Sequence, residues 1–275
     1  MEWIKWFFGF VDYKEEEIAG SLSWQHLLFV SISILLMIGL AVWLGARYKS
    51  KDDKEKNKVL VVSAILIVSF ELVKIVVACM KSDDVIKTIL CNLLPLFLCS
   101  IQLLALPMAA FGKGRLKEAS LDFVLIFGIL GAIFGTVGAM QNYDAYPVLA
   151  FHNVVSTVTH CISGFASIYI FVSGMRSMKK ENMWITFTIL GVFCVVAYIV
   201  NVTTGLVYEG NMFEGSNYMF LMHHHGTPYS IFYNMVNGSP VFYPIIVVGI
   251  FYLYAAIMYF IPVIIQRKKQ AKVKE

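Results

Sequence analysis

The stretch WQHLLFVSISILLMIGLAVWLGA, residues 24–46, contains no Asp, Glu, Lys or Arg and is followed at once by Arg47. About 20 predominantly apolar residues in a helix are enough to cross the ~30 Å hydrocarbon core of a bilayer. Further stretches of the same character are separated by polar connections, and they cover residues 59–79, 87–111, 119–139, 150–175, 184–208 and 241–265. The sequence therefore predicts an all-α polytopic membrane protein built as a bundle of seven transmembrane helices.

The composition agrees with a membrane protein and argues against nucleic-acid binding. Of the 275 residues, 59% are hydrophobic and only 15% are charged, which is unusual for a soluble globular protein. The net charge of +4 comes from basic residues that lie in short runs between the apolar stretches. Such runs are topology signals rather than a basic patch, so we expect no nucleic-acid partner.

The distribution of Lys and Arg predicts how the chain is oriented in the membrane. Most of the 22 basic residues follow the first, third, fifth and seventh apolar stretches. Because basic connections stay in the cytoplasm, we predict an outside N-terminus and a cytoplasmic C-terminus with a basic tail over residues 266–275. The predicted protein is a single transmembrane domain, residues 1–275, in the cell membrane, and the sequence carries no prediction of an oligomeric state.

Two segments outside the predicted spans have a distinctive composition. Residues 1–20 are rich in Trp and Phe, which favours an aromatic segment at the membrane interface. Residues 209–240 form a long outer loop without Lys or Arg, in which Thr227 and Pro228 predict the start of a short helix and Gly238 its end. This loop is interpreted equally as a packed cap or as a lid over a cavity that opens outward.

Polar side chains inside the predicted spans fall on single helix faces, because positions three, four and seven apart share a face. The third stretch carries one such stripe, formed by Asn92, Pro95, Cys99 and Gln102. The fifth stretch carries another, formed by Asn153, Ser156, Thr157, His160 and Ser163. Ionisable groups inside a bilayer are costly and mark a cavity or a functional site.

Two shorter polar sets accompany these stripes. In the second stretch Glu71 and Lys74 are three residues apart, a spacing that allows an ion pair on one helix. In the sixth stretch the same offsets relate Tyr198, Asn201 and Thr204.

Cys99 and His160 are predicted to lie at similar depth in the membrane. At 1.5 Å per residue both are roughly 15 to 18 Å below the outer ends of their helices, with Glu71 and Asn201 slightly above them. A buried thiol reacts only where a neighbour takes its proton, and an imidazole does this. The pattern indicates a site for thiol acyl transfer at the depth of the acyl chains. The alternative is that the thiol is a small buried hydrophobe and the polar groups are contacts between helices.

The candidate site consists of catalytic and substrate-binding residues. Cys99 is the candidate nucleophile, His160 the general base and acid, and Glu71 or Asn201 the group that orients the imidazole. The candidate substrate-binding residues are polar or charged side chains of the same spans, namely Asn92, Gln102, Ser156, Thr157 and Lys74. No Cys-x-x-Cys pair is present, and the adjacent His223, His224 and His225 are interpreted as loop composition, so we expect no metal and no cofactor.

Two motifs resemble a known family. The run Leu94–Cys99, Leu-Pro-Leu-Phe-Leu-Cys, resembles the Leu-Pro-Leu-His-Leu-Cys signature of the bacterial YwaF-like integral membrane proteins. The stretch Asn217–Leu221, followed by Thr227 and Pro228, resembles the second signature of that family. The placement of His160 also fits, and the resemblance covers nearly the whole chain.

The resemblance implies a function. Animal relatives of the family look like Cys-dependent phospholipid acyltransferases, and the more distant androgen-induced hydrolase-like proteins are similar in pairing an intramembrane nucleophile with a His. By this analogy Cys99 is a nucleophile and His160 its partner. The chain departs from the family pattern at Phe97, where the family has His, and at Ser100, where it usually has an acidic residue, so this motif supplies no third catalytic group.

Three classes of function follow from these observations. The leading hypothesis is an intramembrane acyltransferase or lipid hydrolase that acts on phospholipids or lysophospholipids through a thioester on Cys99. The second is a carrier or ligand-binding membrane protein without catalysis, in which Glu71 and Lys74 are the important pair. The third is a structural membrane subunit.

Overall fold

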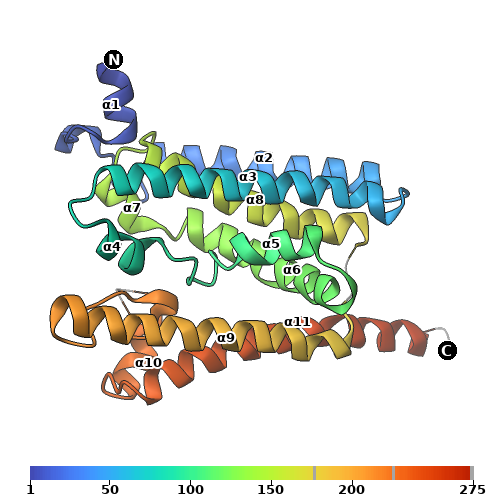
Figure 1. Cartoon of the computed structure of the whole chain (residues 1–275). Helices are drawn as coiled ribbons and strands as arrows, with labels where there is room; N and C mark the ends of the chain where they lie inside the picture. Colours follow the sequence, from blue (N-terminus) through green and yellow to red (C-terminus); the bar gives the residue numbers. More distant parts are fainter. Residues whose placement is uncertain (176–177, 225–226, 273–275) are drawn as a thin grey trace. The chain divides into compact units, whose positions relative to one another are not determined.

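The computed structural model describes residues 1–175, 178–224 and 227–272, with side chains up to residue 261. Every regular element in these ranges is a helix, as the sequence predicts (Figure 1). By their internal contacts the residues divide into two compact units. Unit 1 consists of residues 1–83 and 102–175, and unit 2 of residues 84–101 and the described residues from 178 onward. Each unit is described by itself, and the single domain over residues 1–275 stays a prediction.

Six helices in the described ranges are long and apolar enough to cross a membrane, and they confirm six of the seven predicted spans. They are α2 (Trp24–Tyr48), α3 (Asp53–Met80), α6 (Gly114–Thr136), α8 (Phe151–Ser173), α9 (Lys180–Thr204) and α11 (Phe242–Lys272). The chain is therefore a multi-pass membrane protein. The basic tail expected over residues 266–275 is helical as far as Lys272 and then leaves the described residues.

The third predicted span, residues 87–111, is not one continuous helix, and this expectation was wrong. It contains α4 (Val85–Thr88), one π-helical turn η2 (Ile89–Leu93), a non-helical stretch over residues 94–101, and α5 (Gln102–Phe111). The break lies at Pro95, because a proline disfavours the helical conformation of the residue before it. Leu94 is accordingly extended, with φ −67° and ψ 140°.

The break also removes the predicted polar stripe of this span. Asn92 lies in η2, Cys99 in the non-helical stretch and Gln102 at the start of α5, so helical spacing does not place them on one face. At 1.5 Å per residue α5 is about 15 Å long, half of the ~30 Å hydrocarbon core. The seven-span count and the orientation of the termini stay predictions.

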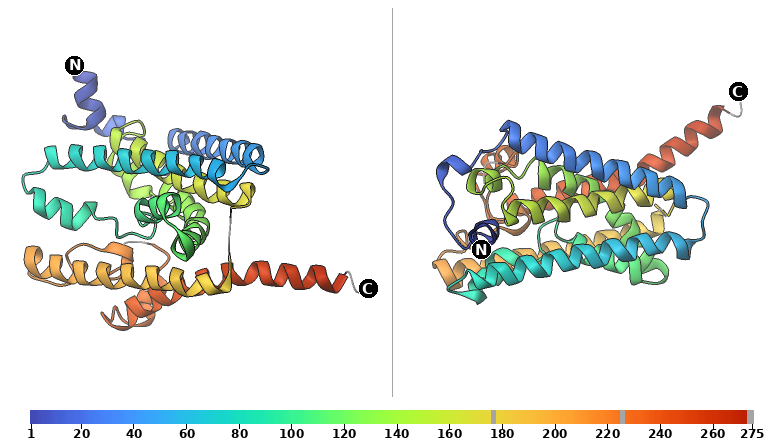
Figure 2. Two further views of the ribbon diagram at one scale, coloured as in Figure 1. Left: turned by 45° about the vertical axis from the view of Figure 1, so that its right-hand side comes forward. Right: turned by 90° about the horizontal axis from the view of Figure 1, so that it is seen from above.

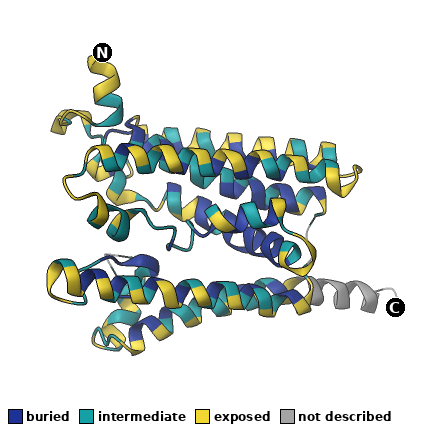
Figure 3. Ribbon diagram, in the orientation of Figure 1, coloured by how far each residue is buried: buried dark blue, intermediate teal, exposed yellow. Residues whose placement is uncertain are grey.

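The core of unit 1 forms where α6 packs against α8. Most of α6 is buried, as the dark ribbon in Figure 3 shows. Gly128 of α6 leaves no room for a side chain beside the Ser163 carbonyl, and the Ser167 hydroxyl donates a 2.7 Å hydrogen bond to the Leu125 carbonyl. The small residues thus allow the close approach of helices that the sequence predicts.

Two further spanning helices lie on either side of α8, which runs between α2 and α3 when seen from above (Figure 2). Ser23 caps the start of α2 by accepting a hydrogen bond from the His26 amide at 3.3 Å, and Asp52 caps α3 by accepting from the Glu55 amide at 2.8 Å. Gly174 ends α8 with a left-handed backbone, φ +78°.

The aromatic N-terminal segment forms the short helix α1 (Glu2–Phe8). Its Phe7 and Phe8 rings pack on Phe151 at the start of α8, with centroids 5.8 and 4.8 Å apart. The Lys81 ammonium donates a 3.0 Å hydrogen bond to the Phe8 carbonyl. The segment is thus held against unit 1, whereas Trp3 stays exposed.

Unit 2 is built on α9 and α11. The two helices are joined by hydroxyl groups, since the oxygens of Thr186 and Tyr259 lie 2.7 Å apart and the Tyr252 hydroxyl donates to the Phe187 carbonyl at 2.9 Å. A π-helical turn, η3 (Gly205–Glu209), continues α9 into the long loop.

The loop over residues 209–240 contains a 3-10 turn, η4 (Tyr218–Phe220), and the short helix α10 (Ser230–Met235). The short helix that the sequence predicts is present and is followed by Gly238 with φ +64°. The predicted start at Thr227 was wrong, because the Thr227 hydroxyl donates to the His224 carbonyl at 2.5 Å instead of capping a helix. The N-cap residue of α10 is Tyr229.

Candidate functional site

The candidate residues are divided between the two units. Unit 2 contains Asn92, Cys99 and Asn201, and unit 1 contains Glu71, Lys74, Gln102, Ser156, Thr157 and His160. The proposed pair of Cys99 and His160 joins two units that are described separately, so it stays a prediction. Each half of the site has its own geometry.

Cys99 lies in a turn rather than in a helix. The Ile101 amide donates to the Phe97 carbonyl at 3.0 Å and closes this turn around the cysteine. The partly buried sulfur is 4.0 Å from the Ser100 hydroxyl oxygen. Asn92, two residues before the break begins, is exposed.

The break before Cys99 is bridged by the side chain of Tyr218. In a continuous α-helix the Leu94 amide donates to the Leu90 carbonyl four residues earlier. Here the Leu94 amide donates to the Tyr218 hydroxyl at 3.1 Å, and that hydroxyl donates to the Leu90 carbonyl, also at 3.1 Å. One phenol therefore takes the place of the broken helical hydrogen bond. Burial raises the pKa of Tyr218 to about 12, so the hydroxyl keeps its proton and remains a donor.

Asn201 of α9 fixes the backbone of Tyr218. Its amide nitrogen donates to the Tyr218 carbonyl at 3.0 Å, and its oxygen accepts from the Tyr218 amide at 2.8 Å and from the Ser216 hydroxyl at 3.0 Å. All three residues are buried. The structure thus gives Asn201 a role in anchoring the loop, and its predicted role in orienting His160 stays a prediction. We call Asn201, Ser216 and Tyr218 the loop anchor.

The rest of the second sequence motif shapes the same loop. Met219 and Phe220 both have φ +57°, a left-handed conformation that is strained for these residues. The Asn217 side chain holds the turn by donating to the His223 carbonyl at 2.7 Å and accepting from the Met222 amide at 3.0 Å. Phe97, which stands where the family has His, packs edge-on against Tyr218 with centroids 5.1 Å apart.

The structure shows a function for Tyr218 that sequence reasoning missed. Tyr218 belongs to a recognised motif, but its partner Leu94 is 124 positions away along the chain. A signal was present in Pro95, since a broken helix in an apolar setting must find new partners for its backbone groups.

His160 in unit 1 packs directly against α6. Gly135 leaves space for the imidazole, and an added side chain at that position would collide with the ring. Within the described part of the chain, no hydrogen bond joins the ring to another residue. Glu71 instead forms the predicted ion pair with Lys74, with 2.7 Å between carboxylate oxygen and ammonium nitrogen.

The remaining candidate residues of unit 1 differ in whether their polar groups have hydrogen-bond partners. The Thr157 hydroxyl lies 2.9 Å from the Tyr143 hydroxyl, and the Ser156 carbonyl accepts from Thr159 at 2.9 Å. Gln102 is fully buried, and neither atom of its amide has a hydrogen-bond partner among the described residues. An unpaired buried amide costs about 1–3 kcal/mol.

A small cationic cleft of about 50 Å³ in unit 1 adds residues that were not predicted. Lys74 and Lys81 are seven positions apart on one face of α3, and the cleft also includes His152, Tyr13 and Tyr146. Partial burial lowers the pKa of Lys81. The seven-residue spacing of the two lysines is visible in the sequence, whereas the contribution of His152 from α8 is not.

The described residues contain no cluster of three or more His, Cys, Asp or Glu side chains that could hold a metal ion. His223 is bound through Asn217, with 3.2 Å between side-chain nitrogens, and the His224 ring packs against Tyr233. His225 lies outside the described residues.

Comparison with known proteins places the chain in a family. A search of curated proteins and a search of solved structures each found no match. The sequence profile of one membrane protein family, the TMEM164 family, matches residues 21–262. This range contains five of the six spanning helices and most of α11, together with the helix break at Pro95 and the loop anchor, and the chain therefore belongs to the TMEM164 family.

Proposed function

We propose that the protein is an intramembrane lipid acyltransferase or lipid hydrolase that acts through a thioester on Cys99. The observation that carries this proposal is the break of the third apolar segment, which sets Cys99 in a non-helical turn next to backbone held by Tyr218. Irregular backbone at membrane depth is tolerated only inside protein or beside a water-filled cavity. A buttressed break beside a cysteine is therefore typical of a functional site.

The proposed reaction has two steps, acylation of the thiol and transfer of the acyl group from it. His160 takes the thiol proton, the sulfur attacks the ester carbonyl of a phospholipid, and the carbon–oxygen bond breaks. The leaving lysolipid oxygen receives the proton from the imidazolium, and the acyl group remains on sulfur. A lysophospholipid hydroxyl or water then gives its proton to His160 and attacks the thioester carbonyl. The carbon–sulfur bond breaks, and the imidazolium returns the proton to the sulfur, which restores the thiol.

Features of unit 1 support the roles of the other residues. The His160 ring forms no hydrogen bond within the described residues, so its acceptor nitrogen is not already occupied by another donor. Lys74 and Lys81 supply cations for a lipid phosphate, and Gln102 supplies an unpaired amide. Asn92, Ser156 and Thr157 stay predicted substrate-binding residues. Because Glu71 is paired with Lys74, we propose that it acts on His160 only through the electrostatics of that pair.

A trapping experiment tests the nucleophile. Protein in phospholipid nanodiscs that carry a labelled acyl chain is expected to acquire a label that neutral hydroxylamine releases, as a thioester does. Cys99→Ser should abolish this label, whereas Cys91→Ser, in the same segment, should retain it. His160→Gln should slow label formation by about 10²–10⁴-fold, the contribution of a general base.

Two results would reject the proposal. One is a thioester label that persists in Cys99→Ser. The other is a folded wild-type protein that forms no thioester and transfers no acyl chain to a lysophospholipid or to water with any of the phospholipid headgroups tested.

A carrier without catalysis is the second candidate, and the Glu71–Lys74 ion pair inside α3 is the observation that favours it. In that case uptake of a ligand into proteoliposomes should fail in Glu71→Gln and survive in Cys99→Ala. The acyltransferase predicts that Cys99→Ala is inactive in acyl transfer.

A further inference from the structure

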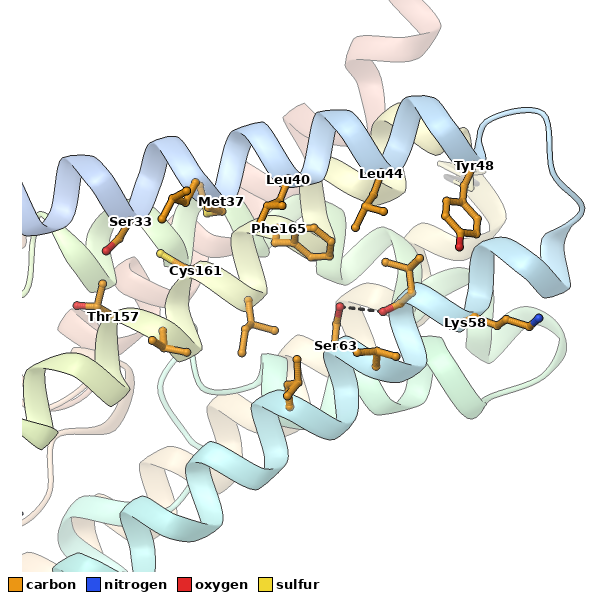
Figure 4. A pocket seen from close by; sticks show the side chains of 16 residues that line it. Ser33, Met37, Leu40, Leu44, Tyr48, Lys58, Ser63, Thr157, Cys161 and Phe165 are labelled. Atoms are coloured by element: carbon orange, nitrogen blue, oxygen red, sulfur yellow. Dashed lines mark hydrogen bonds between the residues drawn. The ribbon is translucent and has the colours of Figure 1, made fainter.

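A cavity of about 580 Å³ lies along the spanning helices of unit 1 (Figure 4). Side chains of α2 and α3 form its two walls, and side chains of α8 form its floor between them. Most of the lining is aliphatic or aromatic and includes Leu36, Leu40, Leu44, Val62, Leu66 and Phe165. We call this cavity the α8 groove.

Away from the end formed by Tyr48 and Lys58, the hydroxyl groups that line the α8 groove already have hydrogen-bond partners. The Ser33 hydroxyl donates to the Phe29 carbonyl at 2.8 Å, and the Ser63 hydroxyl donates to the Val59 carbonyl at 2.9 Å. The Thr157 hydroxyl pairs with Tyr143. The Cys161 thiol is only a weak donor. Away from Tyr48 and Lys58, a polar ligand would find no strong partner along the groove, so hydrocarbon is the chemistry that fits this part of it.

The length of the α8 groove matches a lipid tail. Its lining on α2 extends from Ser33 to Tyr48, and at 1.5 Å per residue this is about 22 Å. One leaflet supplies about half of the ~30 Å hydrocarbon core. An acyl chain of one leaflet therefore fits along the groove, with length left for its ester region.

The two ends of the α8 groove differ in charge. One end is bordered by Tyr48 and Lys58, next to the connection between α2 and α3 (Figure 4). Lys58 is paired with Glu55 at 2.6 Å, but its side chain stays largely exposed. Residues 47–58, which comprise the end of α2, the connection and the start of α3, carry more basic than acidic side chains. Basic clusters directly beside a spanning helix attract anionic lipid headgroups.

We propose that an anionic glycerophospholipid occupies the α8 groove, with one acyl chain along α2 and α8 and its phosphate beside Tyr48 and Lys58. This site uses neither Cys99 nor His160 and does not depend on the proposed reaction. It is a resident lipid site, built into unit 1.

Photo-crosslinking tests the occupant. Protein in nanodiscs receives a trace of phosphatidylglycerol with a diazirine at the middle of one acyl chain, and labelled peptides are mapped by mass spectrometry. Labels should concentrate on groove residues such as Leu40 and Cys161. Equal labelling of Leu35, which is exposed on another face of α2, would show only annular lipid and would overturn the proposal.

Matched variants separate the groove from the general membrane surface. Leu40→Trp fills the groove and should reduce its labelling about tenfold, whereas Leu35→Trp should leave it unchanged. If Leu40→Trp proves unfolded by size-exclusion chromatography, the wild-type distribution of labels over Leu35 and Leu40 decides alone. Unchanged labelling in a folded Leu40→Trp protein would contradict the proposal.

The headgroup is tested by comparing phosphatidylglycerol with phosphatidylcholine carrying the same chain. Wild type should favour the anionic lipid, and Lys58→Gln should lower that preference about fivefold. Glu55→Gln frees the Lys58 ammonium and should raise it. Equal labelling by both lipids would reject the phosphate site, while the reaction at Cys99 would remain testable by thioester trapping.

Discussion

The fifth and third apolar segments carry similar polar patterns in the sequence and have different structures. In α8 the polar residues lie on a continuous helix, where their hydroxyl groups donate to nearby carbonyls and their small size allows close packing. In the third segment Pro95 breaks the helix, and the freed backbone groups depend on Tyr218, far away in the chain. The comparison teaches that similar polar patterns in two apolar segments can have different structural outcomes. In α8 the polar residues pack helices together, and in the third segment they accompany an irregular backbone that another part of the chain supports.

Removing the loop anchor should have the largest effect on this contrast. Asn201→Ala deletes three buried hydrogen bonds and leaves the Tyr218 amide without a partner, whereas the Tyr218 carbonyl keeps the Leu221 amide at 3.3 Å, so we expect a loss of about 3 kcal/mol in unfolding free energy. Denaturation in detergent measures this loss. The control is Asn211→Ala, an exposed asparagine of the same loop, which should cost less than about 1 kcal/mol. Equal effects of the two changes would show that the anchor is not structural.

Removing only the bridging hydroxyl should have a smaller effect. Tyr218→Phe leaves the Leu94 amide and the Leu90 carbonyl unpaired, which we expect to cost about 2 kcal/mol. Hydrogen exchange at the Leu94 amide should accelerate selectively. Tyr198→Phe removes a single, longer bond of 3.3 Å to the Pro240 carbonyl and should leave exchange at Leu94 unchanged. If both variants accelerate it alike, Tyr218 does not bridge the break.

The same contrast explains which features could be predicted from the sequence. Hydropathy alone finds the six continuous spans, and the three-residue spacing of Glu71 and Lys74 predicts their ion pair, because both depend only on neighbours in the chain. The contact of Tyr218 with residues 90 and 94 depends on how unit 2 folds, which no local pattern encodes. Pro95 is a helix-breaking signal in the sequence, but the apolar run on both sides of it favoured a continuous helix.

The α8 side of the comparison is tested by a pair of glycines. Gly135→Ala should force the His160 ring to move, because the new methyl group collides with it. The cost of overpacking is partly offset by the better helix propensity of Ala, so we expect a net loss of about 1 kcal/mol in unfolding free energy. Gly39→Ala in α2 meets open space and should be neutral or slightly stabilising. Unfolding experiments on both variants decide this, and a Gly135→Ala protein as stable as Gly39→Ala would show that His160 is not held on α6.

The smallest effect concerns pH and the cleft beside α8. Partial burial lowers the pKa of Lys81 from its ordinary value of 10.5, so the unfolded chain binds this proton more tightly than the folded protein. Stability should therefore rise slightly as the pH increases toward 10.5, and Lys81→Gln should flatten this rise. Lys49→Gln, an exposed change of equal charge, should preserve it. A rise that is the same in both variants would mean that the Lys81 ammonium is as well solvated in the fold as in the unfolded chain, and it would weaken the case for a phosphate beside Lys74 and Lys81.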